Sequence, residues 1–171
     1  KEYFPAISRE VTKATIPSSV YTNQGEFSIT GISSNAFYGC KISILSIPSS
    51  ISTIRYNAFE KCTNLTKVII PDIAAWCSVK FELYNYTLYR NNNPLAIGSL
   101  YSDENTEITN LVIPDGVTAI NDYTFYFCKN IASVKIPKSV AFIGKDAFQG
   151  CSSLQKIIIS DIAAWCSVSF A

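Results

Sequence analysis

Apolar and polar positions alternate in short runs along this chain, and the same arrangement returns several times. In the stretch 134–154, Val134 and Ile136 flank Lys135, which is the two-residue period of a half-buried strand. Pro137 follows and ends the strand, because proline brings no N–H group to a ladder. The apolar residues of 140–151 then predict a segment that faces inward again and contains a short helical turn. The stretch therefore predicts one coil with a strand and a turn around a shared interior.

The coil repeats with a period of 23 residues, the distance from Pro48 to Pro71 and from Pro114 to Pro137. An isoleucine precedes each proline, and in three coils a phenylalanine follows after eleven residues and a cysteine after fourteen. These columns are Ile47, Ile70, Ile113 and Ile136, with Ile159 next; Phe59, Phe125 and Phe148; and Cys62, Cys128 and Cys151. Such a period is typical of solenoids, propellers and arrays. One strand and one turn per unit favour the leucine-rich class, with six strand rows.

The repeated run IPxSVxxIxxxAFxxCxxLxxVxIP resembles the BspA-like leucine-rich repeats, which occur in surface proteins of host-associated anaerobic bacteria and some protists. A second unit, PDIAAWCSVKF at 71–81, returns 89 residues later as SDIAAWCSVSF at 160–170 and resembles a spacer within such arrays. The resemblance covers about residues 11–171. It implies a right-handed solenoid, a cell-surface location and a binding or adhesion role, without naming a ligand.

We predict a single solenoid domain over residues 1–171. Residues 1–10 would cover the first coil, 11–71 would hold repeats, 72–108 a helix-plus-hairpin insertion, and 109–171 further repeats and a terminal helix unit. Asp72 is placed to cap a helix over 73–77, and a second helix is expected from Asp161 to Cys166. Residues 21–34 read as an expanded loop. The stop at Ala171 suggests a cut through a longer array, with a natural terminus as the alternative.

Composition narrows the function classes. The charged fraction is 16% and the net charge +1, so no basic excess points to nucleic acid. Histidine is absent, which removes the commonest general base and transition-metal ligand. No apolar run is long enough to span a bilayer. The first residue is lysine and methionine is absent, so we expect a processed chain whose signal peptide and anchor lie outside this segment.

The cysteines admit two interpretations. Cys40, Cys62, Cys128 and Cys151 hold one repeat position, and the spacing of about 4.8 Å between neighbouring coils does not forbid disulfides. Stacked equivalents point in parallel, however, whereas a disulfide needs converging Cβ atoms. We therefore expect free buried thiols, and no metal site.

The strand residues that alternate outward form the candidate ligand face. In two columns these are Lys13, Ile44, Lys67, Asn110, Ser133 and Lys156, and Thr15, Ser46, Ile69, Val112, Lys135 and Ile158. Exposed aliphatic residues here would mark an interaction surface, or they would simply be good strand formers. The columns contain no carboxylate, which argues against a glycosidase or lyase. We predict no catalytic residues, no metal and no cofactor.

Three further aromatic or acidic features have two interpretations each. The stretch 84–93 is rich in tyrosine and asparagine and includes Asn92 and Asn93. Its Tyr84, Tyr86 and Tyr89 would be loop contacts for a ligand, or the whole stretch would be a disordered surface loop. Trp76 and Trp165 would pack their helices on the coil beneath, or stack on sugar rings. Asp103 and Glu104 are predicted to form the tip of a hairpin, with a metal site as the less favoured interpretation.

These observations predict a non-catalytic extracellular adhesion or protein-binding module, monomeric, with a surface protein of a host or neighbouring cell as partner. Neither nucleic acid nor direct membrane insertion is expected. The alternative is a structural spacer in a longer surface array. A carbohydrate-binding or carbohydrate-active solenoid is the third interpretation.

Overall fold

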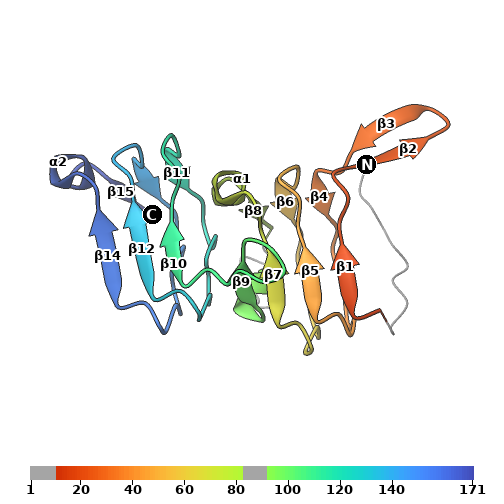
Figure 1. Cartoon of the computed structure of the whole chain (residues 1–171). Coiled ribbons are helices and arrows are strands. Elements are labelled where there is room, and N and C mark those ends of the chain that lie inside the picture. The colour runs from red at the N-terminus through yellow and green to blue at the C-terminus, as the bar shows by residue number, and fades with distance from the viewer. Residues whose placement is uncertain (1–10, 83–91) are drawn as a thin grey trace.

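The computed structural model describes residues 11–82 and 92–171 and confirms the predicted solenoid of parallel strand rows. The rows form two ladders that stand one after the other along the stack (Figure 1). The first ladder contains β1 (Lys13–Thr15), β5 (Ile44–Ser46), β7 (Lys67–Ile69) and β9 (Ser99–Tyr101). The second contains β10 (Asn110–Val112), β12 (Ser133–Ile136) and β14 (Lys156–Ile159).

Every row except that of β9 is followed by a second, shorter strand further along the coil. These strands make two parallel ladders on another side of the stack. They are β4 (Gly31–Ile32), β6 (Thr53–Ile54) and β8 (Lys80–Phe81), followed by β11 (Ala119–Ile120), β13 (Phe142–Ile143) and β15 (Ser169–Phe170). The sequence showed only that these residues turn inward, because two-residue strands are too short to display a period.

The interior is built from the repeat columns. The isoleucines before the prolines, from Ile47 to Ile136, are buried, and the last of the column, Ile159, is partly buried. Phenylalanine rings stack in pairs, Phe37 on Phe59 with centroids 5.2 Å apart and Phe125 on Phe148 at 5.3 Å. The predicted rungs therefore share one core.

The cysteine column fills the same interior, and all six cysteines are free thiols. The thiol of Cys62 donates to the carbonyl oxygen of Phe37 at 2.8 Å, and Cys151 donates to Phe125 at 3.2 Å. Each bond ties one coil to the coil before it. Burial raises the pKa of Cys62 to about 12 and that of Cys151 to about 11.

The turn around each phenylalanine is a chain of tight turns instead of a helix. Hydrogen bonds run from Gln149 to Asp146 and from Cys151 to Phe148, three residues apart. Two positions per coil have positive φ, and Asp146 (54°) and Gly150 (76°) show the pattern. A left-handed residue interrupts helical hydrogen bonding, so no helix extends through this turn.

Two regular helices follow the repeated DIAAWC sequence. Helix α1 (Ile73–Cys77) begins after Asp72, whose side chain accepts a hydrogen bond from the Ala75 N–H at 2.9 Å. Helix α2 (Ile162–Trp165) has the same cap at Asp161. The cap at Asp72 was expected from sequence, and the second helix lies within the predicted unit from Asp161 to Cys166. Within the described ranges, no helix combines the length and apolar character needed to cross a bilayer.

Two segments differ from the expectation. The segment read as an expanded loop contains an antiparallel hairpin, β2 (Ser19–Thr22) with β3 (Gly25–Ser28). The insertion contributes a further row, because β9 pairs in parallel with β7, where six rows had been predicted. The predicted hairpin is present as a tight turn closed by an antiparallel bridge from Tyr101 to Glu107. Its first strand therefore belongs to the solenoid ladder.

The described strands show no backbone pairing from β9 to β10, and asparagine side chains join the two ladders instead. Asn130 accepts from the N–H of Leu100 and donates to the carbonyl oxygens of Leu100 and Ile108. Asn92 accepts from the Asn57 N–H of one half. The short η2 helix (Pro94–Ala96) follows Asn93.

We call the junction between the two ladders, joined by Asn92, Asn93 and Asn130, the asparagine seam. The side chain of Asn93 completes it by reaching the half of the stack that contains β10. Its amide donates to the carbonyl oxygens of Tyr123 and Thr124. The Trp76 indole N–H donates to the same Thr124 oxygen at 2.9 Å. Side-chain donors thus replace the N–H groups that a preceding coil would supply, which satisfies buried backbone oxygens at the break.

Candidate ligand face on the strand ladders

The two predicted outward columns are in register across each ladder. Lys13, Ile44 and Lys67 pair in sequence along one column, and the structure adds Ser99. In the second ladder Asn110, Ser133 and Lys156 pair, as do Val112, Lys135 and Ile158. The columns therefore lie at the spacing of adjacent strands, about 4.8 Å. The outward columns therefore form a regular face. Its first half lies on β1, β5, β7 and β9, its second half lies on β10, β12 and β14, and the two halves have different surroundings.

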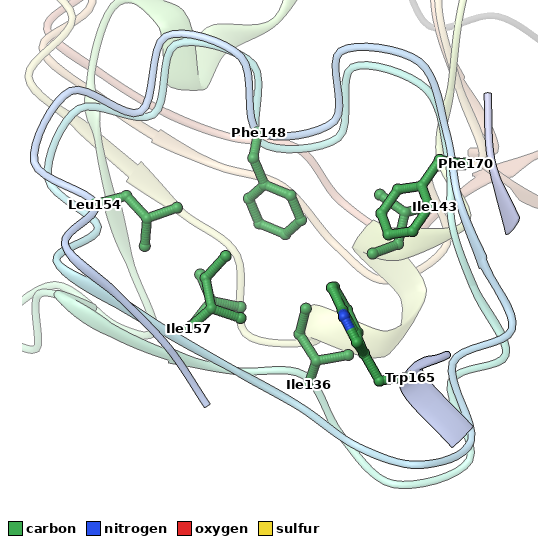
Figure 2. Close-up of a pocket in the computed structure, with 8 residues that line it drawn as sticks. Ile136, Ile143, Phe148, Leu154, Ile157, Trp165 and Phe170 are labelled. Atoms are coloured by element: carbon green, nitrogen blue, oxygen red, sulfur yellow. The ribbon is translucent and has the colours of Figure 1, made fainter. Parts of the chain in front are cut away.

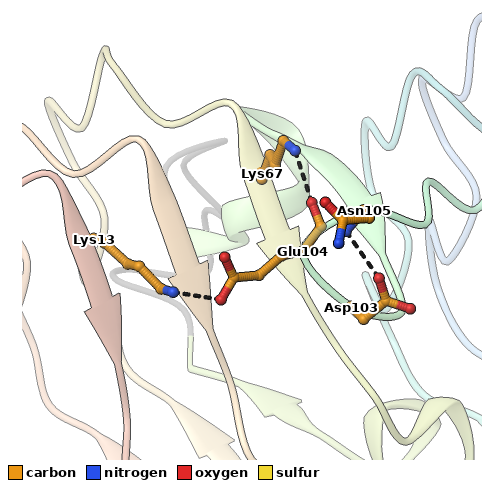
Figure 3. A network of polar contacts seen from close by, with 5 residues as sticks. All are labelled: Lys13, Lys67, Asp103, Glu104 and Asn105. Carbon is orange, nitrogen blue, oxygen red and sulfur yellow. Dashed lines mark hydrogen bonds and ion pairs between the residues drawn. The ribbon is translucent and has the colours of Figure 1, made fainter.

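The first half is partly covered by the hairpin tip, residues 102–106, which folds back over β5 and β7 (Figure 3). The Glu104 carboxylate forms an ion pair with Lys13 on β1. The Lys67 ammonium donates to the Glu104 backbone oxygen at 2.8 Å and lies 4.8 Å from the centre of the Tyr101 ring. Both lysines of this half are thus engaged by the tip.

This arrangement corrects two expectations. Ile69 was predicted to be exposed, and it is 6% exposed because Tyr101 lies beside it on β9 and the tip lies over this end of the ladder. Ile44 is half-buried. The face was also expected to carry no carboxylate, and the Glu104 carboxylate is placed on it by a contact that spans 91 residues of sequence.

Asp103 shapes the tip. Its carboxylate accepts hydrogen bonds from the N–H groups of Asn105 at 2.8 Å and Thr106 at 2.9 Å. The bonds from Asn105 and Thr106 lower the pKa of Asp103. The described residues contain no group of three histidine, cysteine or acidic side chains suited to a metal ion. Asp103 is a turn-forming residue, in line with its expected position at a hairpin tip.

The second half of the face is open. Val112 is 55% and Ile158 39% exposed, and the side chains of Lys135 and Lys156 are exposed. The Ser133 hydroxyl donates to the Asn110 side-chain oxygen at 2.6 Å, which orders the polar column. The result is a rigid surface that alternates aliphatic groups, ammonium groups and a fixed hydrogen-bonding pair. Such a surface suits recognition of a protein patch with acidic and apolar side chains.

The two tryptophans differ in role. Trp76 is buried, and its ring meets Phe81 edge-on at 5.8 Å, so it packs its helix as predicted. Trp165 makes the same contact with Phe170 at 5.6 Å and remains partly exposed. The expected loop contacts Tyr84, Tyr86 and Tyr89 lie outside the described residues. Asn92 and Asn93, which sequence placed in a surface loop, are buried.

Sequence reasoning missed the asparagines of the seam. The insertion itself was the signal that could have predicted them. An insertion interrupts the strand ladder, and the backbone groups left without partners must be satisfied by polar side chains. Two asparagines within the insertion, Asn92 and Asn93, and one in the coil that follows it, Asn130, have side chains that can donate and accept at once.

Comparison with known proteins identifies the family of this chain. A sequence profile of the BspA type leucine rich repeat region matches residues 7–87 and 97–171, with six copies. No curated protein matches the sequence. A Treponema pallidum leucine-rich repeat protein is 21% identical, with a TM-score of 0.49, over 93% of this chain and 72% of its own length.

A leucine-rich cell surface protein from Faecalibacterium prausnitzii is 16% identical, with a TM-score of 0.44, over 93% of this chain and 51% of its own. A leucine-rich repeat protein from Bacteroides capillosus is 21% identical, with a TM-score of 0.38, over 89% of this chain and 79% of its own. The family profile covers most of the chain and coincides with the coils seen in the structure. The chain therefore belongs to the BspA-type leucine-rich repeat family.

Proposed function

We propose that this chain is a non-catalytic protein-binding module of a cell surface, and that its ligand face is the open ladder β10–β12–β14. The observation that carries the proposal is the difference between the two halves of the face. In the first half the lysines are engaged by the hairpin tip. In the second half Lys135 and Lys156 are exposed beside Val112 and Ile158.

The register defines what this surface would recognise. Val112, Lys135 and Ile158 are neighbours in one row, so an ammonium group lies between two aliphatic side chains. An acidic residue flanked by apolar residues on a partner protein matches this row in charge and in hydrophobic contact. The strands already hold the backbone of this row in place, so binding needs little further ordering of the main chain.

Membership of the BspA-type family supports the cell-surface location, since proteins of this kind are found on bacterial surfaces. We place the module outside the cell as a monomer, with a surface protein of a host or neighbouring cell as partner. Neither a cofactor nor a metal has a part in this function.

The test is attachment of the labelled protein to intact host cells and to neighbouring bacteria. A face variant carries Val112→Ser, Lys135→Ser, Lys156→Ser and Ile158→Ser. A matched control carries Lys138→Ser, Lys145→Ser and Ile162→Ser, which removes as many lysines from exposed positions outside the face. We expect the face variant to bind at least about tenfold more weakly and the control to bind like the unmodified protein.

Two further arms identify the partner class. Protease treatment of the target cells should abolish attachment, and binding should weaken with added salt because exposed charges are screened. Attachment that survives in the face variant would remove the ladder as ligand face. A protein that attaches to no cell, in any variant, would instead fit the structural spacer.

A further inference from the structure

The end of the stack beyond β14 carries an apolar hollow of about 190 Å³ (Figure 2). Its lining is entirely apolar and combines core positions with aromatic residues of the α2 unit. The labelled side chains point into one space from several elements. The lining consists of Val134, Ile136, Ile143, Phe148, Leu154, Ile157, Trp165 and Phe170.

The molecule contains a second copy of this surface, 89 residues earlier, in which every equivalent residue is buried. These equivalents are Leu45, Ile47, Ile54, Phe59, Leu65, Val68, Trp76 and Phe81. The contrast is large: Val68 is fully buried and Ile157 is 52% exposed, while Phe81 is 9% and Phe170 62% exposed. The two surfaces have the same chemistry and differ in what lies on them.

The segment 92–101, of sequence NNPLAIGSLY, lies on the earlier copy. Leu100 pairs with Val68 in the parallel ladder, and the N–H of Ser99 donates to the Thr66 oxygen at 2.9 Å. Leu100 and Leu95 are buried in the common core. The fit is close at Gly98, where a Cβ atom would lie 3.1 Å from the Thr66 backbone.

The polar part of the segment is equally specific. The Asn92 side chain accepts a hydrogen bond at 2.6 Å from the N–H of Asn57, a residue with positive φ. The equivalent residue at the open end is Asp146, which has positive φ as well. The open end therefore repeats both the apolar hollow and the backbone geometry that this segment recognises in the first copy.

From this internal match we propose that the end face formed by β14 and α2 is a docking site for a peptide segment with the chemistry of residues 92–101. The occupant is an uncharged segment with two asparagines, then a leucine, a glycine and a second leucine at the spacing of Asn92, Leu95, Gly98 and Leu100. It adds a parallel strand to β14, which is the edge of its ladder among the described strands. Strand addition supplies backbone hydrogen bonds, and the two leucines enter the hollow.

The test uses the full 171-residue protein and a synthetic peptide with the sequence of residues 92–101. Binding is followed by calorimetry and by Trp165 emission, which should shift to shorter wavelength as the ring loses contact with water. A control peptide carries Leu95→Asp and Leu100→Asp. We expect saturable binding of the first peptide below about 1 mM and none of the control.

Two protein variants separate this site from the ligand face. Ile157→Lys places a charge in the hollow and should weaken peptide binding at least about tenfold. Val112→Lys changes an exposed residue of the ligand face on β10, two strands away from β14, and should leave peptide binding unchanged. Denaturation curves confirm that both variants fold.

Three results would overturn the proposal. Peptide binding that is insensitive to Ile157→Lys would place the peptide elsewhere. Absence of saturable binding at about 1 mM would show that the hollow does not accept this chemistry. Self-association that Ile157→Lys abolishes, measured by sedimentation, would make a second copy of the chain the occupant.

Discussion

The stretches 59–82 and 148–171 have nearly the same pattern of residues and different environments. In the first, segment 92–101 and the following coil complete the core on both sides. In the second, the same columns end at an open face. The contrast shows that the repeat sequence specifies where a side chain points, whereas the next element along the stack decides whether that side chain is buried.

The largest difference between the two stretches is expected in the alkylation rates of Cys77 and Cys166, which are equivalent residues. Cys166 is exposed, whereas burial raises the pKa of Cys77 to about 12. At pH 8 only about one Cys77 in ten thousand is a thiolate. We expect alkylation of Cys77 to be at least about a thousandfold slower than that of Cys166. Peptide mass spectrometry after timed labelling measures both rates, and comparable rates would mean that the first unit is open too.

Truncation of the two equivalent phenylalanines should separate the units energetically. Phe59 is fully buried, so Phe59→Ala should lower the free energy of unfolding by about 4 kcal/mol. Phe148 stacks on Phe125 and also borders the open hollow, so Phe148→Ala should cost about 2 kcal/mol. Urea denaturation gives both values. Equal losses would contradict the difference in burial.

A smaller effect is expected where segment 92–101 approaches β7. Gly98→Ala places a Cβ atom 3.2 Å from Val68 Cγ2 and should cost about 1–3 kcal/mol by overpacking. Gly31→Ala is the matched control, because its Cβ atom would meet only the Thr53 oxygen, at 3.7 Å. A loss as small in Gly98→Ala as in the control would show that the segment rests loosely on the strand.

The smallest effect is expected at the hairpin tip. Glu104→Gln removes the ion pair with Lys13, in which both side chains are about half exposed, so the loss should be below about 1 kcal/mol. Amide exchange of residues 102–106 should accelerate, and Ile69 should become more accessible. Glu107→Gln, at an exposed residue outside this ion pair, is the control. Unchanged exchange would show that the remaining tip contacts suffice.

The columns of the solenoid were readable from sequence because a strand alternates strictly and prolines mark each coil. That logic places Lys135 and Ile158 on the outside and Val134 within the core, as observed. The sequence also located the helix cap at Asp72, since an aspartate before an apolar run satisfies free N–H groups locally.

Burial of Ile69 was not readable, because it depends on a segment that returns from more than thirty residues further along the chain. The polarity of Asn92 and Asn93 suggested a surface loop. Both are buried because their side chains form hydrogen bonds with backbone groups that have no strand partner where the ladder is interrupted. Those groups come together only when the two halves of the stack meet.

The asparagine seam has a mechanical consequence. Elsewhere in the stack a pulling force along the axis is shared among rows of backbone hydrogen bonds. Between the two ladders it passes mainly through asparagine side chains and one indole, with one backbone hydrogen bond from Asn121 to Cys77. Tension would therefore part the molecule there first, leaving two intact blocks joined by a short tether. A surface array assembled from such blocks would yield stepwise, extending one block at a time instead of tearing as a whole.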